Sequence, residues 1–155
     1  MKLGISNLRN YVITYVINFV DTGPTTDHTL QSINGFYMYT EATGRKFGDK
    51  ARLLGPVEKA TTGQCLQFWY HMYGSNMGTL SVHLKINNVL QKTAIWSESG
   101  NKGNVWKLAT KTITSSSTYQ VGVGKLRLCT APNIVKYRHY INWILPYSEF
   151  SVRIR

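Results

Sequence analysis

Thiol, imidazole and indole groups are concentrated in the segment QCLQFWYHMYGSNMGTLSVHLKI, residues 64–86. A cysteine and two histidines can bind zinc when their side chains converge on one point. Cys65 and His71 are separated by about 20 Å in an extended strand, which is too far for one metal ion. His83 is expected on the polar face of another strand, as a surface residue. We therefore expect no metal site from these three side chains, and Cys65 is expected to be a buried thiol or half of a disulfide.

The sequence contains none of the common catalytic motifs. It has no G-x-S-x-G elbow, no H-E-x-x-H and no G-x-x-x-x-G-K-[ST] phosphate loop. Its seven acidic residues offer few candidates for paired carboxylates. We therefore predict that the chain is not an enzyme and has no catalytic residues. Trp69, Tyr37 and Tyr39 could instead stack on sugars or bases, although such aromatic side chains more often fill the space between two sheets.

The segment that carries these groups alternates between apolar and polar residues, as β-strands do. Residues 66–72 place large side chains on both faces, whereas residues 80–86 place apolar side chains on one face and polar ones on the other. The residues between them, YGSNMG, suit a hairpin loop. We therefore predict a β-hairpin whose core side chains lie between two sheets: Phe68, Tyr70, Leu80, Val82 and Leu84.

The same alternation recurs along the chain, and no helical stripe of useful length interrupts it. It predicts strands within residues 34–42, 50–56, 89–99, 105–114 and 118–128. Residues 11–20 form an apolar run too short to span a bilayer, which suits either a strand or a weak signal-peptide core. From Lys125 onward we predict neither strand nor helix, and residues 132–155 are expected to be poorly packed. The predicted fold is all-β, an antiparallel jelly-roll-like β-sandwich.

The positive charge is concentrated toward the C-terminus. The formal net charge is +11. Residues 1–100 hold nine Lys/Arg and six Asp/Glu, a balance of +3, whereas residues 101–155 hold nine Lys/Arg and one acid, a balance of +8. Such a surface attracts nucleic acid, anionic lipid or sulfated glycans. None of the lysines forms a run, so a solvated surface is the simpler interpretation. Binding of anionic glycans or nucleic acid through this basic third is the alternative function.

Three segments contain specific motifs in addition to the alternation that predicts strands: residues 22–56, 65–85 and 96–113. They carry, in this order, GPTTDHT, the GFYMY strand, the ARLLGP strand, CLQFWYHM and the GNKGNVW turn. Together these motifs resemble a MAM domain, the extracellular module of meprins, neuropilins and receptor tyrosine phosphatases of the mu type. The resemblance covers most of the chain between Thr22 and Val121.

The resemblance implies a jelly-roll-like β-sandwich that lies outside the cell or at the membrane surface. It implies a non-catalytic interaction or adhesion module of a membrane-associated or secreted protein. The partner would be another protein, with homophilic binding as one form, and no nucleic acid. The resemblance also assigns Asp27 to a cation site, with calcium as the ion, and assigns no other cofactor. It assigns Cys65 to a disulfide, for which Cys129 is the candidate partner.

The two ends depart from the family pattern. The N-terminal segment lacks the family's cysteine-bearing F-E stretch, and the C-terminal segment lacks the D-I-A-L-D-D strand with its final cysteine. We therefore expect a MAM-like domain at residues 22–124, truncated at both ends, between an atypical N-terminal segment (1–21) and an atypical basic tail (125–155). Because Cys129 arrives earlier than the family's cysteine, we expect a buried Cys65 and a free, more reactive Cys129 rather than a bridge.

Overall fold

The computed structural model describes residues 11–15, 23–33, 36–41, 50, 52–75, 77–123 and 138–143. These residues form strands and no helix, so the described part offers no helix that could cross a membrane. The strands are β1 (Tyr11–Tyr15), β2 (Phe36–Glu41), β3 (Leu53–Glu58), β4 (Thr61–His71), β5 (Thr79–Ile86), β6 (Val89–Leu90), β7 (Trp96–Ser99), β8 (Lys107–Ser115), β9 (Tyr119–Val123) and β10 (Arg138–Trp143).

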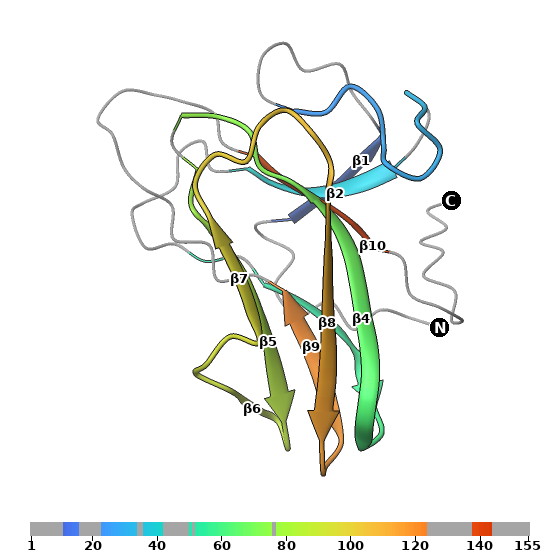
Figure 1. Ribbon diagram of the computed structural model, residues 1–155, viewed down its shortest axis with the longest axis vertical. Coiled ribbons are helices and arrows are strands. Elements are labelled where there is room, and N and C mark those ends of the chain that lie inside the picture. The colour runs from blue at the N-terminus through green and yellow to red at the C-terminus, as the bar shows by residue number, and fades with distance from the viewer. Residues whose placement is uncertain are drawn as a thin grey trace.

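The strands form two antiparallel sheets (Figure 1). Sheet A has the order β1-β2-β10-β4-β8, and sheet B has the order β3-β9-β5-β6, with β7 also paired to β5. Every pair of neighbouring strands is antiparallel. The prediction of an all-β, antiparallel, jelly-roll-like sandwich is therefore confirmed. The strands predicted within residues 34–42, 50–56, 105–114 and 118–128 are present, whereas the one predicted at 89–99 is two short strands, β6 and β7, separated by residues 91–95.

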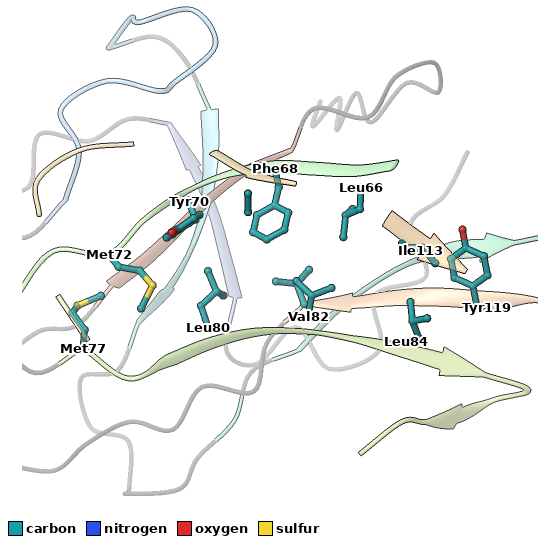
Figure 2. Close-up of a cluster of buried hydrophobic side chains, with 12 residues drawn as sticks. Leu66, Phe68, Tyr70, Met72, Met77, Leu80, Val82, Leu84, Ile113 and Tyr119 are labelled. Carbon is teal, nitrogen blue, oxygen red and sulfur yellow. The ribbon is translucent and has the colours of Figure 1, made fainter. Parts of the chain in front are cut away.

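The core lies between β4 of sheet A and β5 of sheet B. Figure 2 shows Leu66, Phe68 and Tyr70 of β4 pointing toward Leu80, Val82 and Leu84 of β5. Two methionines lie at one end of this layer, and Ile113 and Tyr119 lie at the other (Figure 2). The core side chains predicted from alternation are all buried: Phe68, Tyr70, Leu80, Val82 and Leu84.

The predicted hairpin between β4 and β5 is wrong, because the two strands belong to different sheets. β4 pairs with β10 and β8, whereas β5 pairs with β9, β6 and β7. The connection passes from sheet A to sheet B at one end of the core instead of turning within one sheet. Both of its methionines, Met72 and Met77, are buried there. A hairpin and a crossover between sheets bury the same alternate residues, so alternation alone does not distinguish these two topologies.

The second face of β5 is covered rather than wet. His83 was expected at the surface, yet it and Ser81 are both buried. Residues 91–95 run beside β5, where the backbone N–H groups of Gln91 and Ile95 donate to the carbonyl oxygens of Leu84 and Val82, each at 2.8 Å. These bonds place residues 91–95 at the edge of β5 between β6 and β7, where the carbonyl oxygen of Gln91 also accepts a hydrogen bond from His83.

Strands from both ends of the chain join sheet A. β1 pairs with β2, and β10 lies between β2 and β4, with Ile141 opposite both Met38 and Tyr70. The expectation of no regular element beyond Lys125 is therefore wrong for Arg138–Trp143. The expectation that residues 132–155 are poorly packed stays a prediction. Cys129 and the rest of the two terminal segments lie outside the described residues. The division of the chain at residues 22 and 124 stays a prediction.

Candidate binding surface

The loop of residues 23–33, which contains the D-H-T motif, is fixed by the side chain of Asp27. Its Oδ2 accepts a hydrogen bond from the backbone N–H of Leu30 at 2.9 Å, and its Oδ1 accepts one from Ser32 at 3.2 Å. The backbone N–H of Asp27 donates to the carbonyl oxygen of Ser32 at 3.3 Å. An aspartate that accepts backbone N–H groups ahead of it is a common way to hold a turn. Asp27 is therefore the residue that shapes this loop.

The same contacts bear on the cation site assigned to Asp27. Calcium prefers six to eight oxygen ligands, several of them carboxylates. Both oxygens of Asp27 are engaged by backbone N–H groups, its side chain is only 2% exposed, and the described residues contain no group of three metal-binding side chains. The described donor set does not fit calcium. The calcium site stays a prediction, which a melting-temperature titration with calcium tests.

His28 attaches the loop to the outer face of sheet A. Its ring stacks on Trp69 of β4, with ring centroids 3.5 Å apart and planes 14° apart. Leu66, Phe68 and Tyr70 point into the core, so Trp69 lies on the opposite face of the strand. Trp69 was expected either to fill the space between the sheets or to be open for stacking. It does neither, because it is partly exposed on the outer face with its ring stacked against His28 of the loop.

Trp106 ties the loop to the segment before β8. Its Nε1–H donates to the carbonyl oxygen of Thr26 at 3.1 Å, and its ring meets the ring of Tyr37 edge-on, with centroids 5.8 Å apart. The hydroxyl of Tyr37 donates to the carbonyl oxygen of Pro24 at 3.3 Å. Two loops that are far apart in sequence are therefore joined at one end of the sandwich (Figure 1).

His71 extends this cluster at the end of β4. Its Nε2–H donates to Oδ1 of Asn104 at 2.9 Å, because an amide oxygen only accepts. Its ring meets Trp106 edge-on at 5.6 Å. Asn104 follows a turn in which Gly100 and Gly103 adopt positive φ angles of 74° and 85°, a conformation that glycine enters without steric cost. The G-N-K-G sequence thus positions both partners of His71.

Burial keeps both histidines of the cluster uncharged near neutral pH. It lowers the pKa of His28, against a smaller opposing effect of the Asp27 carboxylate. It also lowers the pKa of His71, against the smaller opposing effect of its hydrogen bond to Asn104. The neutral imidazole is the form that stacks on an indole without bringing a charge into the cluster. The cluster therefore behaves as an aromatic clamp on the loop.

Three exposed apolar side chains lie on the two loops that the clamp joins. Leu30 and Ile33, on the loop itself, are 67% and 58% exposed, and Val105, next to Trp106, is 51% exposed. We call these three residues the D-H-T surface. Single exposed apolar residues are ordinary, but several on one rigid loop system are typical of a protein contact. The sequence shows no Asn-X-Ser/Thr site, so no N-linked glycan shields this surface.

One serine–histidine pair has hydrogen-bond geometry that a nucleophile would need. Nδ1–H of His83 donates to the carbonyl oxygen of Gln91 at 3.0 Å, so Nε2 accepts from the hydroxyl of Ser81 at 3.1 Å. Both side chains are buried, and Ser81 is only 3% exposed. The pair therefore lies beneath the protein surface, and its hydrogen bond to Gln91 holds that residue against β5.

The candidate metal and disulfide residues do not come together. Cys65 and His71 lie on the outer face of sheet A, whereas His83 lies on the outer face of sheet B. Cys65 was expected to be buried. Its thiol is free and exposed, because the first half of β4 extends past the core. The candidate partner Cys129 lies outside the described residues, so a free, more reactive Cys129 without a bridge stays a prediction.

The sandwich and its clamped loop define an interaction domain built on a rigid β-scaffold. The family model described as "MAM domain, meprin/A5/mu" matches residues 12–129. The chain therefore belongs to the MAM domain family, as its motifs predicted.

Curated relatives agree with this assignment. MAM domain-containing glycosylphosphatidylinositol anchor protein 1 of Gallus gallus is 40% identical over 105 residues, which are 66% of this chain and 11% of that protein. Neuropilin-1 of Xenopus laevis is 45% identical over 91 residues, 57% of this chain and 9% of that protein. The chain thus spans about a tenth of the length of these relatives.

A solved structure of similar fold is the K1 cleaved adhesin domain of Lys-gingipain from Porphyromonas gingivalis. It superposes with a TM-score of 0.56 at 11% sequence identity, over 86% of this chain and 87% of that one. At this identity the likeness concerns the fold alone.

Sequence reasoning missed the clamp as a site. His28, Asn104 and Trp106 were not candidate residues, although the D-H-T and G-N-x-G-x-x-W motifs contain all three. Two motifs of unusual residue types on separate loops were the available signal that the loops meet.

Proposed function

We propose that this MAM domain is a non-catalytic extracellular module that binds a second copy of itself through the D-H-T surface. The observation that supports this most is the clamp. Asp27, His28 and Trp106 hold a loop rigidly while its exposed side chains Leu30 and Ile33 stay in solvent. A preorganised apolar surface loses little entropy when it binds, which favours a protein contact.

The location outside the cell or at its surface agrees with the relatives. Several are named glycosylphosphatidylinositol anchor proteins, and another is a neuropilin. The parent protein of this domain is accordingly proposed to be membrane-associated, with a protein as its partner.

Self-association of the domain tests this proposal. Leu30→Lys combined with Ile33→Lys places two like charges in the contact, and we expect association to weaken at least about tenfold. Sedimentation velocity over a concentration series measures the change. Val57→Lys combined with Val89→Lys is the matched control, because these side chains are 67% and 63% exposed on strands of sheet B. Equal weakening in both variants would mean that the D-H-T surface is not the contact between the two copies. A parent chain that stays monomeric over the whole concentration series would exclude homophilic binding.

Binding of anionic glycans remains the second candidate, because two lysines of the basic third, Lys107 and Lys111, are exposed on β8. Retention on heparin that falls steeply between low and moderate salt would favour it. A homophilic apolar contact predicts little change over the same salt range.

A further inference from the structure

β8 forms an open edge of sheet A. It pairs with β4 along its length, and no other strand of the described part pairs with its outer side. The register runs without interruption from Lys107 opposite Tyr70 to Ile113 opposite Gln64. A regular edge strand presents a row of backbone N–H and C=O groups that another extended chain can pair with.

The equivalent edge of sheet B is blocked. β3 contains Pro56, which has no N–H to donate, and its register shifts between Leu54 and Val57. Proline and bulges are the usual devices that prevent an edge strand from pairing. β8 has no proline, and its irregularity is confined to the end beyond Ile113. Of these two edges, β8 is the one able to receive a strand.

The charge along β8 is positive and uncompensated. Lys107 and Lys111 lie on the same side of the strand, about 13 Å apart at strand rise. Neither β4 nor β8 contains an acidic residue. The ion pair found in the described part joins Lys102 to Glu98 instead. Acidic side chains four residues apart on an added strand would reach both lysines.

The same charges disfavour a second copy of β8 as the occupant. An antiparallel pair of β8 strands that uses all nine residues is centred on Lys111, so the two copies of this lysine face each other directly. Like charges directly opposite each other destabilise a strand pair. The lysines therefore select against self-pairing and in favour of an acidic segment.

We propose that the outer edge of β8 receives an extended acidic segment of a protein partner, which continues sheet A as an added strand. When a strand is added to a sheet edge, main-chain hydrogen bonds supply much of the affinity. The two lysines would determine the specificity for an acidic partner. The remaining exposed side chains, Leu108, Thr110, Thr112 and Thr114, suit cross-strand packing on the outer face. Val105 of the D-H-T surface precedes β8, but strand pairing at this edge does not depend on homophilic binding.

A designed peptide tests the proposal on the full 155-residue chain. The probe is a nine-residue peptide of alternating threonine and valine whose third and seventh residues are glutamate. We expect chemical-shift changes in the amides of residues 107–115 and slower hydrogen exchange of the same amides on binding. Combining Lys107→Glu with Lys111→Glu should weaken binding at least about tenfold and transfer it to the peptide with lysine in place of glutamate. Lys50→Glu with Lys92→Glu, also exposed in the parent chain, is the charge-matched control.

Several outcomes would overturn the proposal, and each points to a different explanation of the binding. Equal binding by a peptide with alternate backbone amides methylated would show charge attraction without strand pairing. Equal weakening in the control variant would show that the attraction is diffuse. Slowed exchange in β8 with heparin but not with the peptide would reassign the edge to anionic glycans. No binding at millimolar peptide, or slowed exchange caused by dimerisation alone, would exclude an acidic strand. Leu30→Lys with Ile33→Lys should leave peptide binding unchanged, which separates this result from the test of the D-H-T surface.

Discussion

Asp27 and His28 stabilise the loop of residues 23–33 in two different ways. Asp27 acts within the loop, through two backbone N–H groups, and sets its shape. His28 acts between the loop and the sheet, through its stack on Trp69, and sets its position. A substitution of Asp27 therefore changes the conformation of the loop, whereas a substitution of His28 changes its attachment.

Acid is expected to loosen this attachment. Burial lowers the pKa of both His28 and His71 below the ordinary histidine value of 6.5. The folded chain therefore binds these protons more weakly than the unfolded chain, and folded stability decreases as pH falls from 6.5 through the lowered pKa values. Above pH 6.5 the stability is fully present. Urea unfolding at pH 7.5 and pH 5 should show this decrease.

Replacing both histidines by glutamine, which does not titrate, isolates their part in the pH dependence. The variant should lose less stability than the parent chain over the same pH interval. An identical decrease in both proteins would place the titrating groups elsewhere.

Leu84 tests the assignment of the core face of β5. Leu84→Ala removes a buried side chain between the sheets and should lower the free energy of unfolding by about 2–5 kcal/mol. Leu108→Ala is the matched control, because that leucine is 48% exposed on β8 and should cost less than about 0.5 kcal/mol. Equal midpoints of urea unfolding for the two variants would mean that the faces are assigned wrongly.

At the scale of elements, alternation predicted which residues are buried but not which strands are neighbours. Phe68 and Val82 are core residues in either a hairpin or a crossover, so the pattern in β4 and β5 was correct while their pairing was not. The contacts that Trp69 and His83 make on the outer faces were also unpredictable, because residues of other segments, His28 and Gln91, supply them. The local sequence specifies that a segment is a strand and which of its faces points into the core. Whether side chains on the other face are buried depends on contacts with other segments of the chain.

The register of β4 and β8 gives a direct test of the pairing. Cys65 lies opposite Thr112, and the Cα atoms of opposite residues in an antiparallel pair are about 4.5–5.5 Å apart, within reach of a disulfide. Thr112→Cys in a Cys129→Ser background should therefore form a bridge under oxidising conditions, measured as a loss of two free thiols by mass spectrometry after alkylation. Thr110→Cys, which lies opposite Gln67, is the control. Equal bridging at both positions would mean that the strands slip.

At the scale of the whole molecule, the fold is closed by a strand that the sequence did not reveal. The segment of Arg138–Trp143 has no clear period, yet β10 occupies the interior of sheet A between β2 and β4. The strand is defined by backbone pairing with two segments that are distant in sequence, which the local pattern of residues does not encode. Family resemblance likewise ended before this segment, so neither source of information pointed to it.

Proline at position 141 tests the place of β10. Ile141→Pro removes a ladder hydrogen bond and strains two pairings at once, because Ile141 lies opposite residues of both β2 and β4. We expect the free energy of unfolding to fall by about 3 kcal/mol or more. Ile141→Val keeps the strand and should cost about 1 kcal/mol. A proline variant as stable as the valine variant would remove β10 from the sheet.

The order of strands in sheet A also bears on how the chain is made. β2 and β4 are both synthesised well before β10, so a growing chain presents an open slot between two completed strands until β10 leaves the ribosome. The β10 of a neighbouring chain carries the same sequence and fits the same slot. Reciprocal exchange of this one strand would link two copies without any new contact surface, and crowded synthesis of many copies on one messenger is the condition that favours it.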